Sequence, residues 1–590
     1  MNTWQLEDIY SSAHAKELSS DCELVERLIE DFCAKHKNKL TIDALQESIV
    51  DYETIINFAE KIGGYAFLQL QTRLDNHEAL TFFQEKTEWL CEVSSRLVFF
   101  CNDIARLDKK KVEASIERSE ILKKYESWIS NCFRYQPHLL SNEAEEALAK
   151  KFMTSSNSWI RMFDEILACL QFNFEGEEKT FTELLEIANH SDNEEKRARA
   201  AKSISEKLTE NSFYFKHIYN NVMLDRRIEN KLRNYEKPES FRNLSNNIDQ
   251  ASVDFLVEAI ESRYEQTSHR YYALKAKILG KQKLEYWDRN ISIKLSNIFN
   301  KKFDYKAAAG LVLETFCAFS PIFADIASDF INKNWIDVYP KLGKTSGAFA
   351  CSCSTSVHPY ILLNYFDTIR DVSTLAHELG HGIHQVLAAK NGALLAETPI
   401  TLAELASLFA EKLLFEKLFA NAETIEEKID LLCWRLDDTI NSTIRQISFF
   451  KFERDAHELR STKELFVEDL SEIFLKNQRK CLGNSVNVDE CVGIYWTYIS
   501  HFFHSPFYVY AYAFGEIFVN ALYKNYKKFS DNFVEKYIKM LSKGGIDRYD
   551  IAAQTFDLDP SKKEFWKDGV DEIEAQINYL ENLYNGLLCN

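Results

Sequence analysis

The sequence predicts an all-α protein, meaning a mostly α-helical one, and three observations lead to this fold class. The 590 residues include only 17 Gly and 8 Pro, the residues that form turns and end helices. The first proline is Pro137, so the preceding part of the chain contains none. Apolar residues recur at helical spacing between charged ones, as in the segment 79–90. We therefore expect long helices and few loops.

The predicted helices follow one another along the chain. Several amphipathic helices are expected over 15–125, another around Trp159, and one with a solvated face over 194–208. The polar segment 234–247 is a candidate boundary. From Val372 the helical pattern resumes and dominates to the end. The chain is too long for one ordinary core, so we expect several subdomains or one large helical assembly.

A change of composition between Trp335 and Asp367 predicts one short β-element. Glycines, a proline and a Ser/Cys/Thr run occur there, followed by the apolar, partly β-branched segment Tyr360–Tyr365. Its boundaries are those of a short strand. Because the next predicted helix lies near 372–389, we expect the strand to present an exposed edge beside that helix.

Charge and cysteine content restrict the class of protein. The net charge of −19 opposes binding to a nucleic-acid backbone or an anionic membrane, because both would be repelled. No run of about 18 uncharged apolar residues occurs. The start of the chain lacks the basic and apolar segments of a signal peptide. The 13 cysteines contain no C-x-x-C pair, so we expect free thiols and a cytoplasmic location.

The motif H-E-x-x-H at His377, Glu378 and His381 carries the predicted chemistry. Positions i and i+4 of a helix share one face, so the two imidazoles can bind one metal ion. Glu378 stands beside the first histidine, where it can act as a general base toward water. Zinc is the natural ion, because three protein ligands leave a fourth position for water.

The surroundings of the motif argue against a chance pair of histidines on an exposed helix. Leu379, Ile383 and other apolar residues make the rest of the helix hydrophobic, so it is expected to be buried, and buried polar groups need partners. Gly380 and Gly382 each lower helix stability by about 1 kcal/mol, which suggests that another part of the chain approaches closely.

The third metal ligand is a choice among carboxylates. The extended pattern H-E-x-x-H-x-x-G-x-x-H is absent, because His384 stands in the place of its Gly. His384 lies too far along the helix to join the site easily and is assigned to the pocket wall. Glu397, Glu404 and Glu411 are the candidates, and Glu404 is preferred because it lies nearer the start of its helix.

A second constellation occupies the aromatic segment 495–512. It contains His501, Tyr508 and Tyr512, and the two tyrosines would share a face if the segment were helical. A phenol or an imidazole N–H aimed at the oxyanion of peptide hydrolysis would stabilise it. The alternative is a helix of the aromatic core.

These residues carry a resemblance to a known family. H-E-L-G-H-G-I-H at 377–384 and A-E-L-A-S at 403–407 resemble the thimet oligopeptidase and oligoendopeptidase F family of zinc metallopeptidases, and its oligoendopeptidase F branch most. The segments W-Q-L-E-D-I-Y at 4–10, Y-Q-P-H-L-L-S at 135–141, H-P-Y-I-L-L-N at 358–364 and P-F-Y-V-Y-A-Y-A at 506–513 are also similar to it.

The resemblance implies roles for individual residues. His377, His381 and Glu404 would bind one zinc ion per chain, and Glu378 would be the general base. His501 would contact the transition state together with Tyr508, for which Tyr510 and Tyr512 are rivals. Ser500 and His504 depart from the residues usual in the family.

The family fold implies two helical halves that enclose a deep substrate channel. On that basis we divide the chain into an N-terminal helical domain, 1–195, and a zinc-peptidase catalytic domain, 196–590. The expected function is a zinc-dependent oligoendopeptidase of short peptides, without nucleic-acid or membrane partners and with the oligomeric state left open. The alternatives are a zinc exopeptidase of the carboxypeptidase or dipeptidyl carboxypeptidase type, and a catalytically silent peptide-binding protein.

Overall fold

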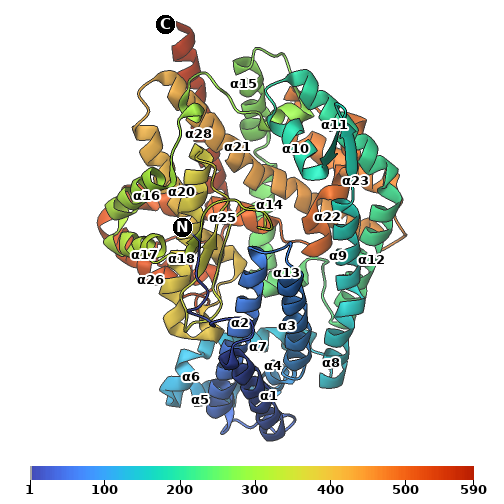
Figure 1. The fold of residues 1–590 in the computed structure, drawn as a ribbon, viewed down its shortest axis with the longest axis vertical. Helices are drawn as coiled ribbons and strands as arrows, with labels where there is room; N and C mark the ends of the chain where they lie inside the picture. The colour runs from blue at the N-terminus through green and yellow to red at the C-terminus, as the bar shows by residue number, and fades with distance from the viewer. Residues whose placement is uncertain (1–2, 590) are drawn as a thin grey trace. The chain divides into compact units, whose positions relative to one another are not determined.

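A computed structural model of the chain describes residues 3–589, without the side chains of Ile400, Ser530 and Asp531. The structure is mostly helical, which confirms the predicted class (Figure 1). The chain folds into two compact units, each assembled from three separate stretches. Unit 1 comprises Met1–Lys151, Asn300–Lys417 and Tyr523–Asp557, and unit 2 comprises Phe152–Phe299, Leu418–Leu522 and Leu558–Asn590.

Unit 1 contains the helices of the N-terminal stretch and those around the H-E-x-x-H motif. Its helices are α1 (Lys16–His36), α2 (Leu45–Gln71), α3 (His77–Ser95), α4 (Phe99–Arg106), α5 (Lys109–Arg118), α6 (Glu120–Lys124), α7 (Glu126–Tyr135), α8 (Asn142–Lys151), α16 (Tyr305–Phe319), α17 (Pro321–Asn332), α18 (Ile369–Ala388), α19 (Ala393–Ala396), α20 (Ile400–Ala420), α26 (Ser530–Leu541) and α27 (Tyr549–Gln554). The last three residues of α20 belong to unit 2.

Unit 2 contains the remaining helices and two small pairs of strands. Its elements are α9 (Ser156–Ala168), β1 (Gln171–Phe174), β2 (Glu177–Thr180), α10 (Phe181–His190), α11 (Glu194–Glu210), α12 (Ser212–Leu232), α13 (Ser240–Ser245), α14 (Gln250–Glu261), α15 (Arg270–Ile278), β3 (Leu284–Glu285), η4 (Tyr286–Asn290), α21 (Ile425–Ile440), η7 (Asn441–Arg445), α22 (Gln446–Arg460), α23 (Val467–Leu482), β7 (Val486–Asn487), η9 (Glu490–Tyr498), α24 (Ser500–His504), α25 (Tyr510–Lys528) and α28 (Lys563–Cys589). Here β1 pairs with β2 and β3 with β7. The last six residues of α25 belong to unit 1.

The predicted β-element lies next to α18 in unit 1, as a three-stranded sheet of β4 (Ile336–Asp337), β6 (Tyr360–Leu362) and β5 (Phe349–Cys351) in that order. The middle strand β6 pairs in parallel with β4 and antiparallel with β5. The prediction that segment 360–365 presents an exposed edge is therefore wrong, because both sides of its strand are already hydrogen-bonded. The edge strand next to α18 is β5.

The sequence-derived domain boundary remains a prediction. Position 195/196 falls within α11, inside unit 2, so the units group the chain in a different way. The cysteine prediction is confirmed, since all 13 cysteines are free thiols. Within the described range, no helix is both long and apolar enough to span a bilayer.

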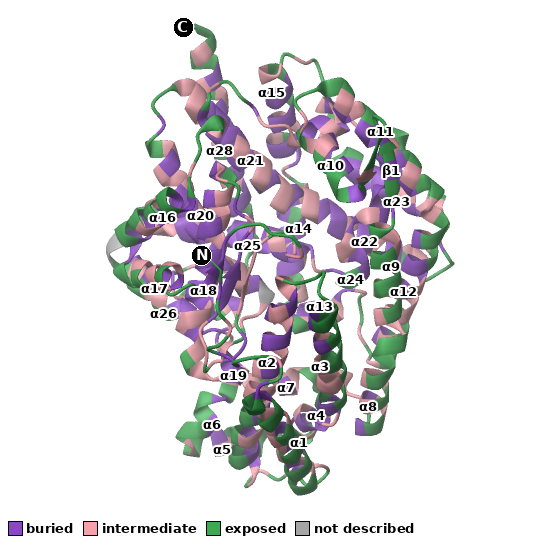
Figure 2. Ribbon diagram, viewed as in Figure 1, coloured by how far each residue is buried: buried purple, intermediate pink, exposed green. Residues whose placement is uncertain are grey.

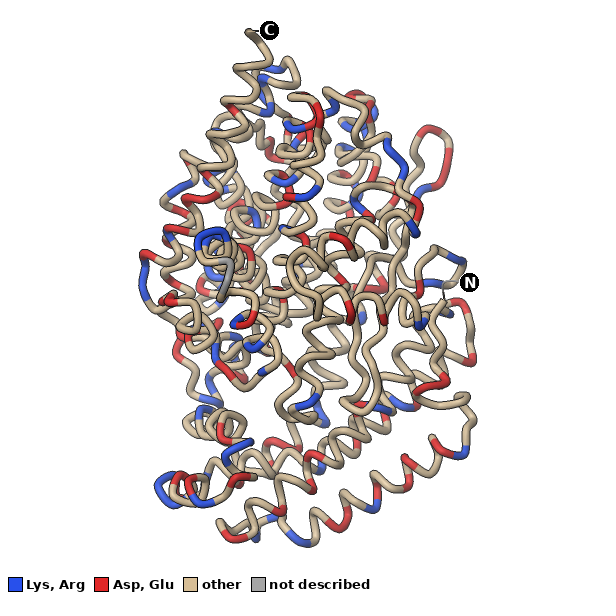
Figure 3. The backbone as a smooth tube through the Cα atoms, turned by 90° about the vertical axis from the view of Figure 1, so that its left-hand side faces the viewer, with Lys and Arg blue, Asp and Glu red and all other residues tan. Residues whose placement is uncertain are grey.

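The burial and charge patterns agree with the helical periodicity seen in the sequence. Figure 2 shows buried and exposed positions alternating along the helices, and α18 has buried residues over much of its length. Figure 3 shows acidic residues interspersed with basic ones along the chain, so the net charge of −19 is not confined to one segment.

Candidate active site

Helix α18 begins at a capping box and presents the H-E-x-x-H motif from its middle turns. The backbone N–H of Asp371 donates to the Thr368 hydroxyl at 3.2 Å, and that of Thr368 donates to the Asp371 carboxylate at 2.8 Å. These bonds satisfy donors that a helix start leaves unpaired. The helix confirms the one predicted near 372–389 and places His377 and His381 one turn apart, with Glu378 next to the first histidine.

The two glycines of the motif let neighbouring helices approach α18. A Cβ atom on Gly380 would lie 2.6 Å from the backbone oxygen of Ala406 in α20, and one on Gly382 would lie 2.6 Å from the Phe330 ring in α17. Real Cβ atoms do not approach other atoms so closely. The expected close approach is thus found, and at Gly380 its partner is the helix that carries Glu404.

His377, His381 and Glu404 converge on one point. Their ligand atoms all lie within 4.8 Å of one another. The Glu404 carboxylate is 3.6 Å from Nε2 of His377 and 3.5 Å from Nε2 of His381. Ligand atoms of a tetrahedral zinc site with bonds of about 2.0–2.1 Å are about 3.4 Å apart. The three residues therefore fit a zinc ion in both donor chemistry and spacing.

Glu411, seven residues after Glu404 on α20, contacts the opposite side of His377. Its carboxylate is hydrogen-bonded to Nδ1 of His377. A carboxylate at this position fixes the tautomer and the ring orientation of a metal-binding histidine. The two carboxylates thus meet different nitrogens of His377: Glu404 lies on the Nε2 side, with the His381 imidazole, and Glu411 lies on the Nδ1 side.

The ionisable groups of this cluster favour a bound cation. Burial raises the pKa of Glu404, but the imidazoles of His381 and His377 outweigh that effect and hold it at about 2. Burial lowers the pKa of His377, but Glu411, Glu378 and Glu404 outweigh it and raise it to about 10. Glu404 is therefore ionised at neutral pH, and its negative charge would attract a metal ion to the point where the three side chains converge.

Glu378 is only 6% exposed, and its Oε2 atom has no hydrogen-bond partner among the described residues. Burial raises its pKa, and the nearby imidazoles of His377 and His381 oppose that rise. A buried carboxylate oxygen without a partner is uncommon and calls for an explanation.

A cavity of about 700 Å³ in unit 1 opens beside His381. Its wall includes His384, Glu397 and two residues of the edge strand β5, Ala350 and Cys351. His384 is buried, and burial together with the His381 imidazole lowers its pKa to about 4, so it is neutral. The structure thus places His384 and Glu397 in the pocket wall and not among the converging ligand atoms.

His501, Tyr508 and Tyr512 form a second cluster, in unit 2. Nε2 of His501 is 3.1 Å from the Tyr512 hydroxyl, and the His501 ring lies 5.8 Å from that of Tyr508. Burial lowers the pKa of His501, so its imidazole is neutral and one ring nitrogen can donate. Tyr510 lies elsewhere, fully buried and hydrogen-bonded by Asn246 at 2.8 Å.

The aromatic segment is not the continuous helix on which the shared face of Tyr508 and Tyr512 was predicted. A turn separates α24 from α25, and Phe507 in that turn has φ of +59°. The backbone N–H of Phe507 donates to the buried Glu453 carboxylate at 2.7 Å. The rings of Tyr508 and Tyr512 still meet, with centroids 5.3 Å apart, because the turn redirects Tyr508.

The site has two histidines and a carboxylate around one point, and a second buried carboxylate lies beside them on a helical scaffold. This arrangement is that of a metallopeptidase. Comparison with known families agrees: residues 187–572 match the model described as Peptidase family M3, and residues 103–172 match that described as Oligopeptidase F. The chain belongs to Peptidase family M3.

Individual relatives span nearly the whole chain. The chain is 28% identical to an oligoendopeptidase F homolog of Borreliella burgdorferi, covering 98% of each sequence. It is 26% identical to oligopeptidase PepF of Bacillus subtilis, covering 93% of this chain and 82% of that one. The crystal structure of oligoendopeptidase-F from Enterococcus faecium superposes with a TM-score of 0.71 at 21% identity, covering 96% of this chain and 98% of that one.

Proposed function

We propose that the chain is a zinc-dependent oligoendopeptidase that cleaves internal bonds of short peptides. The observation that carries the proposal is the convergence of His377, His381 and Glu404, with the unpartnered oxygen of Glu378 beside them. The names of the relatives, oligoendopeptidase F and oligopeptidase, support the substrate class.

His377, His381 and Glu404 would hold the zinc ion, which when bound supplies Lewis acidity toward water and the scissile carbonyl. Glu378 would accept the proton of the attacking water and pass it to the leaving amine. Its raised pKa suits this task, because a carboxylate with a higher pKa is a stronger base. Glu411 would hold His377 in the orientation that the site requires.

His501 and Tyr508 are proposed to stabilise the oxyanion that forms during hydrolysis, as the family resemblance implies. The hydrogen bond between the Tyr512 hydroxyl and Nε2 of His501 fixes that ring nitrogen, which supports a positioning role for Tyr512. Tyr510 is an unsuitable rival, because its hydroxyl is committed to Asn246 within the core. A donor preset toward a developing charge is effective because it need not reorient.

The edge strand β5 is the proposed docking strand for the substrate backbone. Ala350 and Cys351 line the cavity that also contains His381, and β5 has β6 on one side only. Pairing with a strand edge uses main-chain groups, so it tolerates many side chains. Segment 360–365 is unsuitable for this pairing, because its strand β6 lies in the middle of the sheet.

A mixed library of peptides, digested by the zinc-loaded protein and analysed by mass spectrometry, tests the proposal against its alternatives. Internal cleavage of peptides of roughly 5 to 20 residues is expected, since flexible chains lose mainly conformational entropy on binding. Release of only one or two residues from the C-terminus would identify an exopeptidase. Zinc binding without cleavage of any peptide would identify a silent peptide-binding protein.

Substrate size provides a second test. One cleavable sequence can be presented as a free peptide, within a long disordered chain and in a loop of a stable domain. The free peptide should be cleaved fastest and the folded loop not at all. Equal rates for the free peptide and the folded loop would contradict an oligopeptidase and favour a general endopeptidase.

A further inference from the structure

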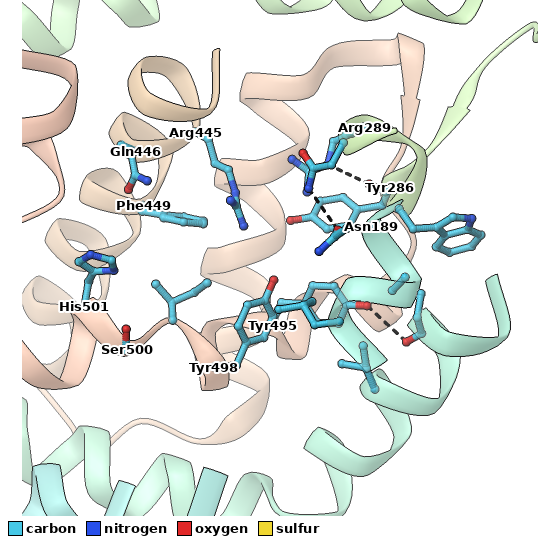
Figure 4. Close-up of a pocket in the computed structure, with 17 residues that line it drawn as sticks. Asn189, Tyr286, Arg289, Arg445, Gln446, Phe449, Tyr495, Tyr498, Ser500 and His501 are labelled. Carbon is cyan, nitrogen blue, oxygen red and sulfur yellow. Dashed lines mark hydrogen bonds between the residues drawn. The ribbon is translucent and has the colours of Figure 1, made fainter. Parts of the chain in front are cut away.

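A second cavity, of about 280 Å³, lies within unit 2 and is lined by basic and phenolic side chains (Figure 4). Its wall includes Arg289, Arg445, Tyr286, Tyr498 and His501. No Asp or Glu is among the described residues that line it. A cavity with two guanidinium groups and no carboxylate has an excess of positive charge.

Arg289 is a buried cation without a counter-ion. Its side chain is 3% exposed; Nε donates to the backbone oxygen of Tyr286 at 2.9 Å, whereas Nη1 has no hydrogen-bond partner within the described residues. The adjacent carboxylate, that of Asp288, is committed to Arg197 and Lys281, each at 2.6 Å. Among the described groups, Arg289 forms no ion pair. An isolated buried charge is strongly unfavourable unless something neutralises it.

Arg445 enters the same cavity from the π-helical turn η7. Its guanidinium lies 4.9 Å from the centre of the Phe449 ring, and its buried Nε has no partner in the described part of the chain. In Figure 4 its tip points toward the hydroxyls of Tyr286 and Tyr498. Burial raises the pKa of Tyr498 to about 12, so this phenol keeps its proton and can donate.

We propose that this cavity binds a carboxylate. Guanidinium groups pair with carboxylates through parallel N–H donors, and a phenol adds a further donor. A water molecule could accept from Arg289 or Arg445, but it would leave their charges uncompensated. A carboxylate accepts from a guanidinium group and neutralises its charge at the same time, and the apolar parts of the wall, such as Phe449, suit its carbon chain.

The carboxylate has two possible sources, a small free acid or the C-terminus of a peptide. The second source rests on the proposed function. His501 lines the cavity, so a peptide whose C-terminus enters it would pass beside a residue proposed to act in hydrolysis. Binding there would favour peptides with a free C-terminus over the same peptides as amides.

The first experiment measures the free acid alone. Titration calorimetry and thermal melting of the full-length protein compare sodium acetate with sodium chloride and sodium phosphate at equal ionic strength. Acetate should bind one site per chain and raise Tm more than chloride or phosphate does. R445Q should weaken acetate binding by about tenfold or more, the factor that one hydrogen bond to a charged group represents.

Two further variants make this result specific. R199Q removes a charge from α11 in the same unit, where Arg199 is half-exposed and paired with Glu175, and should leave acetate binding unchanged. Y498F removes only a hydroxyl and should weaken binding several-fold even if R445Q does not fold. The proposal would be overturned if acetate and chloride had equal effects, or if phosphate bound more strongly than acetate. It would also be overturned if both R445Q and Y498F bound acetate as strongly as the wild type.

The second experiment distinguishes the sources. A short peptide is prepared with a free C-terminus and as its amide, and both are titrated into E378Q so that no hydrolysis intervenes. A roughly tenfold preference for the acid that disappears in E378Q/R445Q assigns the site to the peptide terminus. Equal binding of acid and amide, with acetate binding intact, assigns it to a free acid. The acetate result stands even if no peptide is cleaved, so the two proposals can fail separately.

Discussion

The Glu411 carboxylate is hydrogen-bonded to Nδ1 of His377, which directs the other ring nitrogen toward Glu404. Replacing Glu411 by Gln removes the charge and keeps the size. We expect zinc affinity or activity to fall by about 10- to 100-fold, the usual effect of losing such a partner. Glu404→Gln should lower zinc affinity and activity further, because it removes a proposed ligand. Glu416→Gln, a partly exposed change on the same helix, is the control, and metal content with kcat/KM is the measurement.

Glu378→Gln should retain zinc and lose turnover. The amide cannot accept a proton from water, and general base catalysis contributes about 10²- to 10⁴-fold. The measurements are metal content and kcat on one fluorogenic peptide. A zinc-loaded mutant that turns over at the wild-type rate would show that another group is the base.

Gly380→Ala should separate α18 from α20. The new methyl would lie 2.6 Å from the Ala406 carbonyl oxygen, so the helices must move apart and take Glu404 away from the histidines. We expect a loss of about 1–3 kcal/mol of stability, typical of overpacking, and weaker zinc binding. Gly310→Ala in α16 is the control, because its Cβ would meet nothing within 4 Å. Because Gly310→Ala replaces a glycine inside a helix, it should raise the free energy of unfolding by up to about 1 kcal/mol.

Removing the metal should lower the thermal stability of the protein. In its absence Glu378, Glu404 and Glu411 remain together without their cation, and the free energy of metal binding to the folded state is lost. Melting with and without a chelator measures the change, and added zinc should reverse it. The variant His381→Asn, which lacks one ligand, should respond little to the chelator. An identical Tm for the wild type under both conditions would argue against a resident metal.

Peptides N-methylated at successive backbone positions should bind unequally. Each methyl removes one main-chain donor, and those donors that pair with the edge of β5 should matter most. Measuring KM or binding to the Glu378→Gln variant for the series locates them. Uniform binding across the series would mean that the strand is not the docking edge.

The convergence of His377, His381 and Glu404 could be predicted because their pattern is local. His377 and His381 are one turn apart, and Glu404 lies on the next long helix. Helical geometry alone therefore identifies these residues as candidates. The contact of Glu411 with Nδ1 of His377 required the structure, since sequence spacing does not show which nitrogen of a histidine a carboxylate meets. The glycines of the motif predicted a close approach of another part of the chain. Only the packing in the structure identifies the backbone oxygen of Ala406 as the atom that Gly380 approaches.

The error at the β-element has a different origin. The strands β4 and β5, which flank β6, are only two and three residues long, and no periodicity is visible over such lengths. The segment 360–365 therefore appeared to stand alone. In the same way, the positive φ of Phe507 interrupts an apparently helical run, and a sequence pattern does not report a turn that a distant carboxylate, Glu453, holds in place.

Unit 1 is completed late in synthesis. Helix α20 carries Glu404, and it packs against residues that the ribosome adds much later: the Tyr537 hydroxyl donates to the backbone oxygen of Leu405 at 2.9 Å, and the Phe409 ring lies 4.6 Å from that of Tyr537. A growing chain that already contains His377, His381 and Glu404 therefore still lacks part of the surface against which the helix of Glu404 packs. We therefore expect the cluster of His377, His381 and Glu404 to form only after most of the chain has emerged from the ribosome.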